Sequence, residues 1–169
     1  FTADRDIAVI QFVSGSVNIK SAVEDVVQAP AIPGRTIQKG DIIHIGENGR
    51  SELVTINQDI RIKLDELTEL SLQASNQATQ IELHYGKVFT ESRTKSNKNS
   101  FIETPSSRVK LGNSEIWIHC NYSGEDEIFL IEGQVIVQNK KFNTRQNISI
   151  GETIFSGKTG LSEKEEIHS

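Results

Sequence analysis

Sulfur-containing and aromatic residues are scarce in this 169-residue chain, which has one cysteine, no methionine and 6% aromatic residues. A single cysteine excludes an internal disulfide, and with it a small scaffold held together by disulfides. It does not exclude an oxidising compartment, because many envelope proteins contain few cysteines. Because only 36% of the residues are hydrophobic, we expect a thin core, as in a stack of short sheets.

Long apolar runs and a strong charge of one sign are also absent. No run approaches the ~18 apolar residues that a membrane-spanning helix needs. The net charge is -5 and the acidic and basic residues are interspersed, so the pattern excludes the basic footprint of a nucleic-acid-binding protein. The chain starts at Phe1 and not at Met. We therefore expect a trimmed or mature fragment, with membrane anchoring only through a segment that this chain lacks.

Short apolar segments that end at Gly, Pro or Asn fill most of the chain. β-Branched and aromatic side chains pack well on a pleated sheet, whereas Gly and Pro interrupt its hydrogen bonds, so these segments predict strands. Residues 60–64 alternate, with Arg61 and Lys63 on one face, which predicts a strand with one solvated face. We predict an all-β fold with little helix, β-solenoid-like or β-sandwich-like, with a domain over 1–155 and a polar tail or linker over 156–169.

Several connections can also be predicted. Lys39-Gly40-Asp41 is typical of a tight turn before a strand, and Asn48-Gly49 is the strongest short signal for a β-hairpin. Residues 91–100 contain no apolar side chain, which predicts a solvated, mobile loop. Residues 21–28 could begin a helical turn, but Pro30 follows closely, which favours a loop that crosses the sheet.

Three glycines stand at the same place in a repeated pattern, two residues before a valine within an apolar segment. They are Gly15, Gly86 and Gly133. A recurrent glycine inside strand patterns indicates a bend or bulge, because glycine lets the backbone turn where other residues cannot. A duplication would also produce such a pattern, although the intervals are unequal.

Seven motifs occur in order along the chain. They are Gly15-Ser16-Val17, Gly34-Arg35-Thr36-Ile37-Gln38-Lys39-Gly40-Asp41-Ile42-Ile43, Ser51-Glu52-Leu53, Gly86-Lys87-Val88, Glu103-Thr104-Pro105-Ser106-Ser107-Arg108-Val109, Glu132-Gly133-Gln134-Val135-Ile136-Val137 and Gly151-Glu152. In this order they resemble the FecR domain family, the periplasmic domain of iron-siderophore transmembrane signal regulators, which also occurs in many bacterial envelope proteins. The resemblance covers about Val13 to Ile154. One turn departs from it, because the segment 111–117 keeps Gly112 but lacks the threonine that usually follows.

The resemblance implies an all-β domain in the periplasm or outer cell envelope, with no chemistry of its own. In the signal regulators this domain relays an outer-membrane event to a cytoplasmic anti-sigma segment. We therefore expect a non-catalytic extracytoplasmic module that mediates protein interaction or signal relay, with an envelope protein as its partner. Regulation of a sigma factor is one role that the resemblance allows.

The residue pattern contains no catalytic or metal-binding arrangement. The candidate ligands are His44, His84, His119 and Cys120; the last two are adjacent, so on a strand they point to opposite faces. No paired-cysteine or paired-histidine spacing occurs. We predict no metal, no cofactor and no enzymatic activity. A hydrolase in which His44 or His84 activates Cys120 stays as an alternative, although a free cysteine on a strand is usually part of the core.

Three aromatic residues near one another in sequence could form an interaction surface. They are Trp117, Tyr122 and Phe129. Tryptophan and tyrosine are enriched at interfaces, although aromatic residues this sparse are more often core in a β protein. The alternative function is a surface or periplasmic protein that binds glycan or peptidoglycan through Trp117 and Tyr122.

Overall fold

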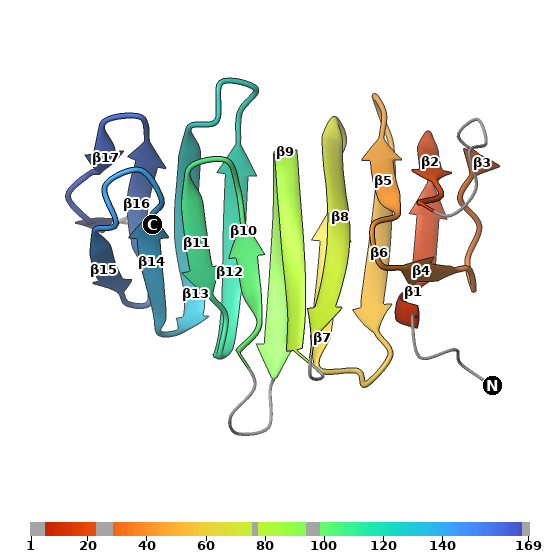
Figure 1. The fold of residues 1–169 in the computed structure, drawn as a ribbon, viewed down its shortest axis with the longest axis horizontal. Helices are drawn as coiled ribbons and strands as arrows, with labels where there is room; N and C mark the ends of the chain where they lie inside the picture. The colour runs from red at the N-terminus through yellow and green to blue at the C-terminus, as the bar shows by residue number, and fades with distance from the viewer. Residues whose placement is uncertain (1–5, 23–28, 76–77, 94–98, 167–169) are drawn as a thin grey trace.

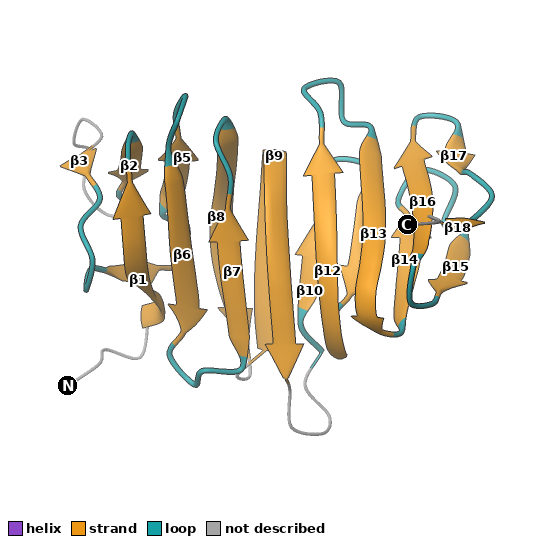
Figure 2. Ribbon diagram, turned by 180° about the vertical axis from the view of Figure 1, so that it is seen from behind, coloured by secondary structure: helices purple, strands orange, loops and turns teal. Residues whose placement is uncertain are grey.

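The structure, a computed structural model, describes residues 6–22, 29–75, 78–93 and 99–166. These residues form eighteen strands and no helix (Figure 1), which confirms the prediction of an all-β fold. The strands lie in two facing layers, sheet A and sheet B, and the sheet as a whole is not closed. Figure 1 looks onto sheet B, and Figure 2 looks onto sheet A from behind. Nothing in the described ranges is a helix long and apolar enough to cross a membrane.

Sheet A contains the longer strands. Its order across the sheet is β4 (Thr36–Gln38), β1 (Asp6–Ser14), β6 (Arg50–Thr55), β7 (Ile60–Leu64), the second half of β9 (Ala78–Arg93), β12 (Asn113–Cys120), β13 (Asp126–Gly133) and β16 (Glu152–Gly157). Two short strands, β17 (Gly160–Leu161) and β18 (Glu165–Glu166), pair with β16 at the end of this sheet. All of these pairs are antiparallel.

Sheet B lies across the core from sheet A. Its order is β3 (Ala29–Pro30), β2 (Val17–Lys20), β5 (Ile42–Ile45), β8 (Thr68–Ser75), the first half of β9, β10 (Phe101–Glu103), β11 (Ser107–Lys110), β14 (Val135–Asn139) and β15 (Arg145–Ile148). The pair β9–β10 is parallel and the others are antiparallel. Strand β9 therefore belongs to both layers.

The core is one cluster, mostly of isoleucine, leucine and valine side chains, between the two sheets. Strand β7 shows how alternation builds it: Ile60, Ile62 and Leu64 are buried, whereas Arg61 and Lys63 are exposed. This burial confirms the prediction of a strand with one solvated face. Because every strand contributes only its inward residues, a chain with few apolar residues can still fill a thin core.

Glycine turns the chain from one sheet to the other. Gly86 divides β9, whose first half pairs with β8 and β10 in sheet B and whose second half pairs with β7 and β12 in sheet A. Its φ is +107°, and a Cβ there would lie 2.4 Å from Thr68 Cα. Only glycine adopts this φ without strain and leaves room for the neighbouring strand. The prediction that glycine turns a corner is confirmed at this position.

The Asn48-Gly49 turn differs from the predicted hairpin. Strand β5 before it pairs with β2 and β8 in sheet B, whereas β6 after it pairs with β1 and β7 in sheet A. A two-residue hairpin turn of this type needs positive φ at both central residues, and here Asn48 has a φ of +62° while Gly49 lies outside that region. A Cβ on Gly49 would lie 2.3 Å from Ser16 O. The glycine therefore allows close packing at a corner.

Three other connections can be compared with their predictions. The turn at residues 39–41 forms as predicted, with the Asp41 amide donating to Gln38 O at 3.0 Å.

The predicted loop over 91–100 is wrong at its start, because residues 91–93 complete β9 and pair with β12. Residues 94–98 of this loop lie outside the described residues, and so do residues 23–28 of the predicted crossing loop. In the predicted tail, residues 156 and 157 belong to β16, and β17 and β18 follow. The division at residue 155 stays a prediction.

Candidate functional site

Three aromatic side chains lie in line on the outer face of sheet A. Trp117 on β12 is directly opposite Phe89 on β9 and Phe129 on β13. Each is partly exposed and stands between buried neighbours on its own strand, so all three rings are on the solvent side. The Nζ of Lys63 lies 5.7 Å from the centre of the Phe89 ring, within the range of a cation–π contact. We call Phe89, Trp117 and Phe129 the aromatic row.

A β-bulge turns a fourth aromatic ring, that of Phe12, to the same face of sheet A and into line with the aromatic row. In the pairing of β1 with β6, Ile10 faces Leu53 and Phe12 faces Glu52, so Gln11 is the extra residue. Without the bulge, regular alternation after the buried Ile10 would turn Phe12 into the core. With it, Phe12 is 45% exposed and lies with Phe89 and Trp117 along a groove of about 370 Å³. The groove also contains charged side chains, among them Glu52, Lys63 and Asp65.

The structure joins two of the three predicted surface residues. Trp117 and Phe129 are cross-strand neighbours, whereas Tyr122 lies in the turn between β12 and β13, is 76% exposed and packs on Tyr85 with ring centres 4.7 Å apart. Sequence reasoning missed Phe89 and Phe12. Alternation within residues 81–89 could have indicated Phe89, but no local signal marks the bulge that exposes Phe12. Whether these residues bind a partner stays a prediction.

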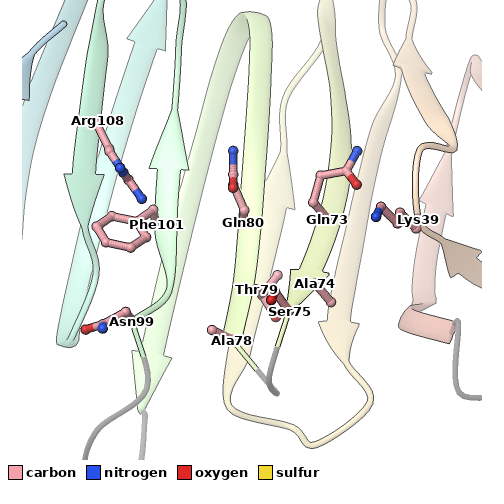
Figure 3. A pocket seen from close by; sticks show the side chains of 10 residues that line it. All are labelled: Lys39, Gln73, Ala74, Ser75, Ala78, Thr79, Gln80, Asn99, Phe101 and Arg108. Carbon is pink, nitrogen blue, oxygen red and sulfur yellow. The ribbon is translucent and has the colours of Figure 1, made fainter.

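A second hollow, of about 600 Å³, lies on the outer face of sheet B. Its floor includes Gln73 and Gln80, which face each other across β8 and β9. Lys39 lies at one side and Phe101 with Arg108 at the other (Figure 3). The lining is polar, with amide, hydroxyl and cationic side chains. This surface and the aromatic row thus differ in chemistry and lie on opposite sides of the molecule.

Two of the candidate metal ligands, His44 and His84, lie beside the same carboxylate on sheet B. Glu69 Oε2 is 2.8 Å from His84 Nδ1, and Glu69 Oε1 is 3.6 Å from His44 Nδ1. The Tyr85 hydroxyl is 3.2 Å from the same nitrogen of His44; burial, followed by the charge of Glu69, raises the pKa of Tyr85. Within the described ranges, no group of three or more histidine, cysteine, aspartate and glutamate side chains is placed to hold a metal ion.

In the same cluster, Ser71, His84 and Glu69 contact one another in the sequence serine, histidine, carboxylate that a hydrolytic triad has. Ser71 Oγ lies 3.4 Å from His84 Nε2, and Glu69 accepts on the other side of that ring. However, the Ser71 hydroxyl donates to Glu82 Oε2 at 3.0 Å, and the residue is only 4% exposed. A nucleophile must be free to reach the carbon that it attacks. The arrangement is therefore a hydrogen-bonded network on the sheet surface.

Cys120 is buried, and within the described residues no hydrogen bond joins its thiol to an imidazole. Its Sγ lies 3.8 Å from the backbone carbonyl oxygen of His84 and 3.6 Å from that of Asn121. Burial, with the charge of Asp126 second, raises the pKa of the thiol far above its ordinary value. His119 points to the opposite face, where its ring lies 6.1 Å from that of Trp117. The geometry therefore gives no support to a hydrolase based on Cys120.

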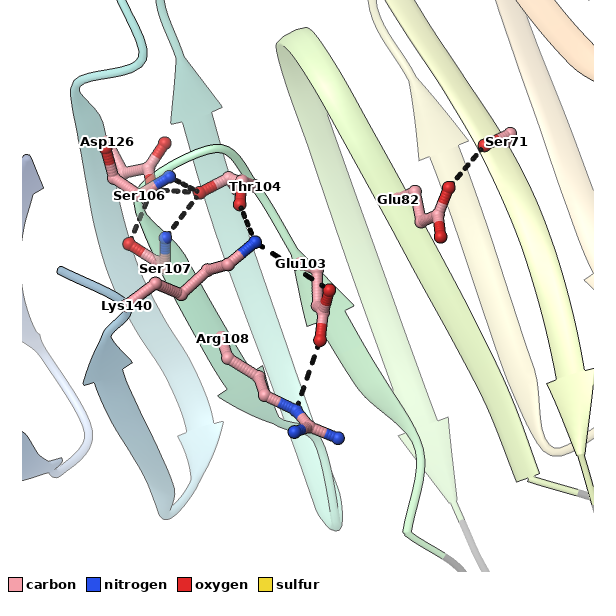
Figure 4. Close-up of polar contacts among 9 residues, drawn as sticks. All are labelled: Ser71, Glu82, Glu103, Thr104, Ser106, Ser107, Arg108, Asp126 and Lys140. Carbon is pink, nitrogen blue, oxygen red and sulfur yellow. Dashed lines mark hydrogen bonds and ion pairs between the residues drawn. The ribbon is translucent and has the colours of Figure 1, made fainter. Parts of the chain in front are cut away.

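Two of the seven motifs that resemble the FecR family stabilise turns. In the Thr-Pro motif, Thr104 Oγ1 accepts the backbone amides of Ser106 and Ser107 at 3.2 and 2.9 Å and donates its own hydrogen to Asp126 (Figure 4). The hydroxyl of Ser107 donates to the same carboxylate. In the Gly-Asp motif, Asp41 accepts the backbone amides of Ala22 and Gln38 at 3.0 and 2.9 Å. The motifs thus specify the fold, and the aromatic row lies mainly outside them.

The fold and its surfaces define an all-β module with two chemically distinct outer faces. Comparison with protein families then shows which module it is: residues 41–136 match the family described as FecR protein. The match spans more than half of the chain, and the chain belongs to this family, as the order of its motifs predicts. No curated protein matches the chain.

Solved structures with the same fold come from Parabacteroides distasonis ATCC 8503. Two crystal structures of a candidate anti-sigma factor, at 1.65 and 2.50 Å resolution, give TM-scores of 0.65 and 0.64. Each is 13% identical to this chain and covers 74% of it, whereas the chain spans 59% of the length of those structures. At this identity the similarity shows the fold alone.

Proposed function

We propose that this chain is a non-catalytic module that docks a protein partner on its aromatic row and relays a signal at the bacterial cell envelope. Membership of the FecR family supports a regulatory role. The similarity to a candidate anti-sigma factor supports regulation of the same class. The observation that carries the proposal is the cross-strand alignment of Phe89, Trp117 and Phe129 on the outer face of sheet A.

The aromatic row has the composition of an interface centre. Tryptophan and other aromatic residues dominate the binding energy of protein interfaces, where a rim of polar side chains surrounds them. Here Glu52 and Lys63 border the row, with their charged atoms 3.9 Å apart, and Arg50 lies 3.6 Å from Asp65 next to them. A partner that buries the rings would leave these exposed ion pairs at its edge, where desolvation is small.

The envelope location is part of the proposal. It rests on the family, whose domains act outside the cytoplasmic membrane in the signal regulators. Protease treatment of spheroplasts that express the full-length gene product tests it. Digestion of this domain in intact spheroplasts is the expected result, and protection until the inner membrane is broken would contradict it.

The alternative of glycan binding through Trp117 and Tyr122 has less support. It needs both rings on one surface, but Trp117 lies in the aromatic row and Tyr122 packs on Tyr85. We therefore assign the aromatic row to a protein partner.

Site-specific photocrosslinking tests the docking surface. A photoreactive amino acid replaces Phe129 in the cell, and the same amino acid replaces Phe101 on the opposite face as a control. The expected result is one protein captured from position 129 and not from position 101. That protein, once purified, should shift the fluorescence of Trp117, which is the one tryptophan of the chain.

The affinity of the purified partner then decides the proposal. Trp117→Ala should weaken binding by about 2 kcal/mol or more, as for a hot-spot residue, while Phe101→Ala should leave the affinity unchanged. Equal affinities for the wild type and Trp117→Ala, or loss of binding with Phe101→Ala instead, would overturn the assignment of the row.

A further inference from the structure

The hollow beside Gln73 and Gln80 continues into a second hollow on the same face. The second one measures about 240 Å³ and is lined by Lys110, Ile136, Gln138 and Arg145. Phe101 and Arg108 line both hollows, so the two hollows adjoin. Together the two make a furrow that crosses strands β8, β9, β10, β11, β14 and β15. At ~4.8 Å per strand, this path is about 24 Å long.

The charge of this furrow is opposite to that of the molecule. The chain has a net charge of -5, yet the described residues that line the two hollows include Lys39, Arg108, Lys110 and Arg145 and no acidic side chain. Among the residues that the structure describes, Lys39, Lys110 and Arg145 form no ion pair. An unneutralised row of cations on an acidic protein attracts an anionic ligand.

Arg108 is held in place at the centre of the furrow. Its guanidinium carbon lies 3.9 Å from the centre of the Phe101 ring, and its Nε lies 3.3 Å from Glu103 Oε1 (Figure 4). That Nε still lacks a hydrogen bond of good geometry in the described part of the chain. Lys140 Nζ also lies 3.9 Å from Glu103 Oε2. The negative charge of Glu103 is therefore shared between two cations and does not fully neutralise Arg108. A positioned guanidinium suits a carboxylate ligand.

The floor of the furrow offers neutral hydrogen-bonding groups. The side chains of Gln73, Gln80 and Asn99 line the larger hollow (Figure 3), and none of them hydrogen-bonds within the described residues. An amide has two donors and an acceptor with two lone pairs. Three such groups beside the fixed guanidinium of Arg108 can therefore bind a ligand that carries both hydroxyl and carboxylate groups.

We propose that the furrow on sheet B binds an anionic saccharide chain that bears carboxylate groups. The amides of Gln73 and Gln80 bind sugar hydroxyls, and Lys39, Arg108 and Arg145 bind carboxylates along the chain. The length of the furrow fits several sugar units. An acidic peptide matches less well, because peptides bind sheets by adding a strand along an edge, and this furrow runs across the face of the sheet instead.

Calorimetric titration of the purified chain tests the proposal. The probes are alginate oligosaccharides, which carry carboxylates, neutral dextran oligosaccharides, and poly-L-glutamate of matched charge. The expected result is binding of alginate that weakens as salt rises, with no binding of dextran and at least about tenfold weaker binding of poly-L-glutamate. Absence of alginate binding, or equal affinity for alginate and poly-L-glutamate, would overturn it.

Variants locate the ligand. Gln73→Ala combined with Gln80→Ala should weaken alginate binding about 25-fold, since each neutral hydrogen bond contributes a factor of about five; Lys39→Ala should weaken it too and reduce the salt dependence. Lys63→Ala, on sheet A, is the matched control and should bind normally. Circular dichroism checks that each variant is folded. Unchanged affinity in the glutamine double variant, or a shift of Trp117 fluorescence by alginate, would place the ligand elsewhere and refute the assignment.

Discussion

Gly86 and Thr68 are in contact at the corner where β9 passes from sheet B to sheet A, and a Cβ on Gly86 would lie 2.4 Å from Thr68 Cα. Thr68 also fixes the corner through its hydroxyl, which accepts the Lys87 amide at 3.0 Å. The two halves of β9, before and after this corner, pair with different neighbours. The two sheets are thus joined within a single strand, at a position that has no space for a side chain.

Substitution of Gly86 by alanine should strongly destabilise the fold. The positive φ of Gly86 and the clash with Thr68 act together, and we expect a loss of about 2–4 kcal/mol in the free energy of unfolding. Chemical denaturation measures it. Gly151→Ala is the matched control, because Gly151 has a φ of +82° but no atom within 4 Å of the added Cβ. It should lose only about 1 kcal/mol from backbone strain. Equal losses in both variants would show that the clash has no effect.

The buried carboxyl of Asp126 should make stability fall as pH rises. Burial raises its pKa above the ordinary 3.8, despite hydrogen bonds from Ser107 and Thr104 that lower it. The folded state therefore binds this proton more tightly than the unfolded state does. The stabilisation is complete below pH 3.8 and is lost as pH rises through the folded-state pKa.

Comparison with Asp126→Asn isolates this effect. Asparagine does not titrate, so the difference in unfolding free energy, wild type minus variant, should decrease from about pH 3.5 upwards and then level off. Urea denaturation at a series of pH values measures it. A difference that increases with pH would show that the folded-state pKa is lowered, contrary to our expectation.

Trp117 and Ile118 should separate docking from folding. They are adjacent on β12, with Ile118 fully buried and Trp117 partly exposed. Ile118→Ala should cost about 2–5 kcal/mol of stability through the cavity that it leaves, whereas Trp117→Ala should cost clearly less. Thermal unfolding measures both. A larger loss for Trp117→Ala would mean that the indole supports the fold, and the aromatic row would then lose its role as a docking surface.

Local patterns in the sequence predict the strands well but not the outer surfaces. Alternation over 60–64 predicts both the strand and its solvated face, because each depends only on neighbours along the chain. The aromatic row depends on register between strands: Phe89 and Trp117 are opposite each other although 28 positions separate their numbers. Such a register is set by the packing of the whole core. The same holds for Phe12, which the bulge at Gln11 turns outwards.

The wrong prediction at Asn48-Gly49 has a related cause. The dipeptide does form a turn, but the partners of β5 and β6 lie in different sheets. Glycine is needed there because Ser16 O would lie 2.3 Å from a Cβ. The sequence shows that a glycine is present, but it does not show whether the glycine is needed for a positive φ or for close packing. Proximity in sequence likewise groups Tyr122 with Trp117, whereas the turn directs the Tyr122 ring to Tyr85.

Cys120 should be unreactive in the folded protein. Burial and the nearby Asp126 raise the pKa of its thiol, so the thiolate, which is the reactive form, is scarce at neutral and mildly alkaline pH. We expect a thiol reagent such as DTNB to modify Cys120 only as fast as the protein unfolds. The matched control is Tyr122→Cys in a Cys120→Ala background, where the new thiol occupies a position that is 76% exposed and should react within the mixing time. Rapid modification of the folded wild type would reveal an accessible thiolate and would reopen the possibility of chemistry at this residue.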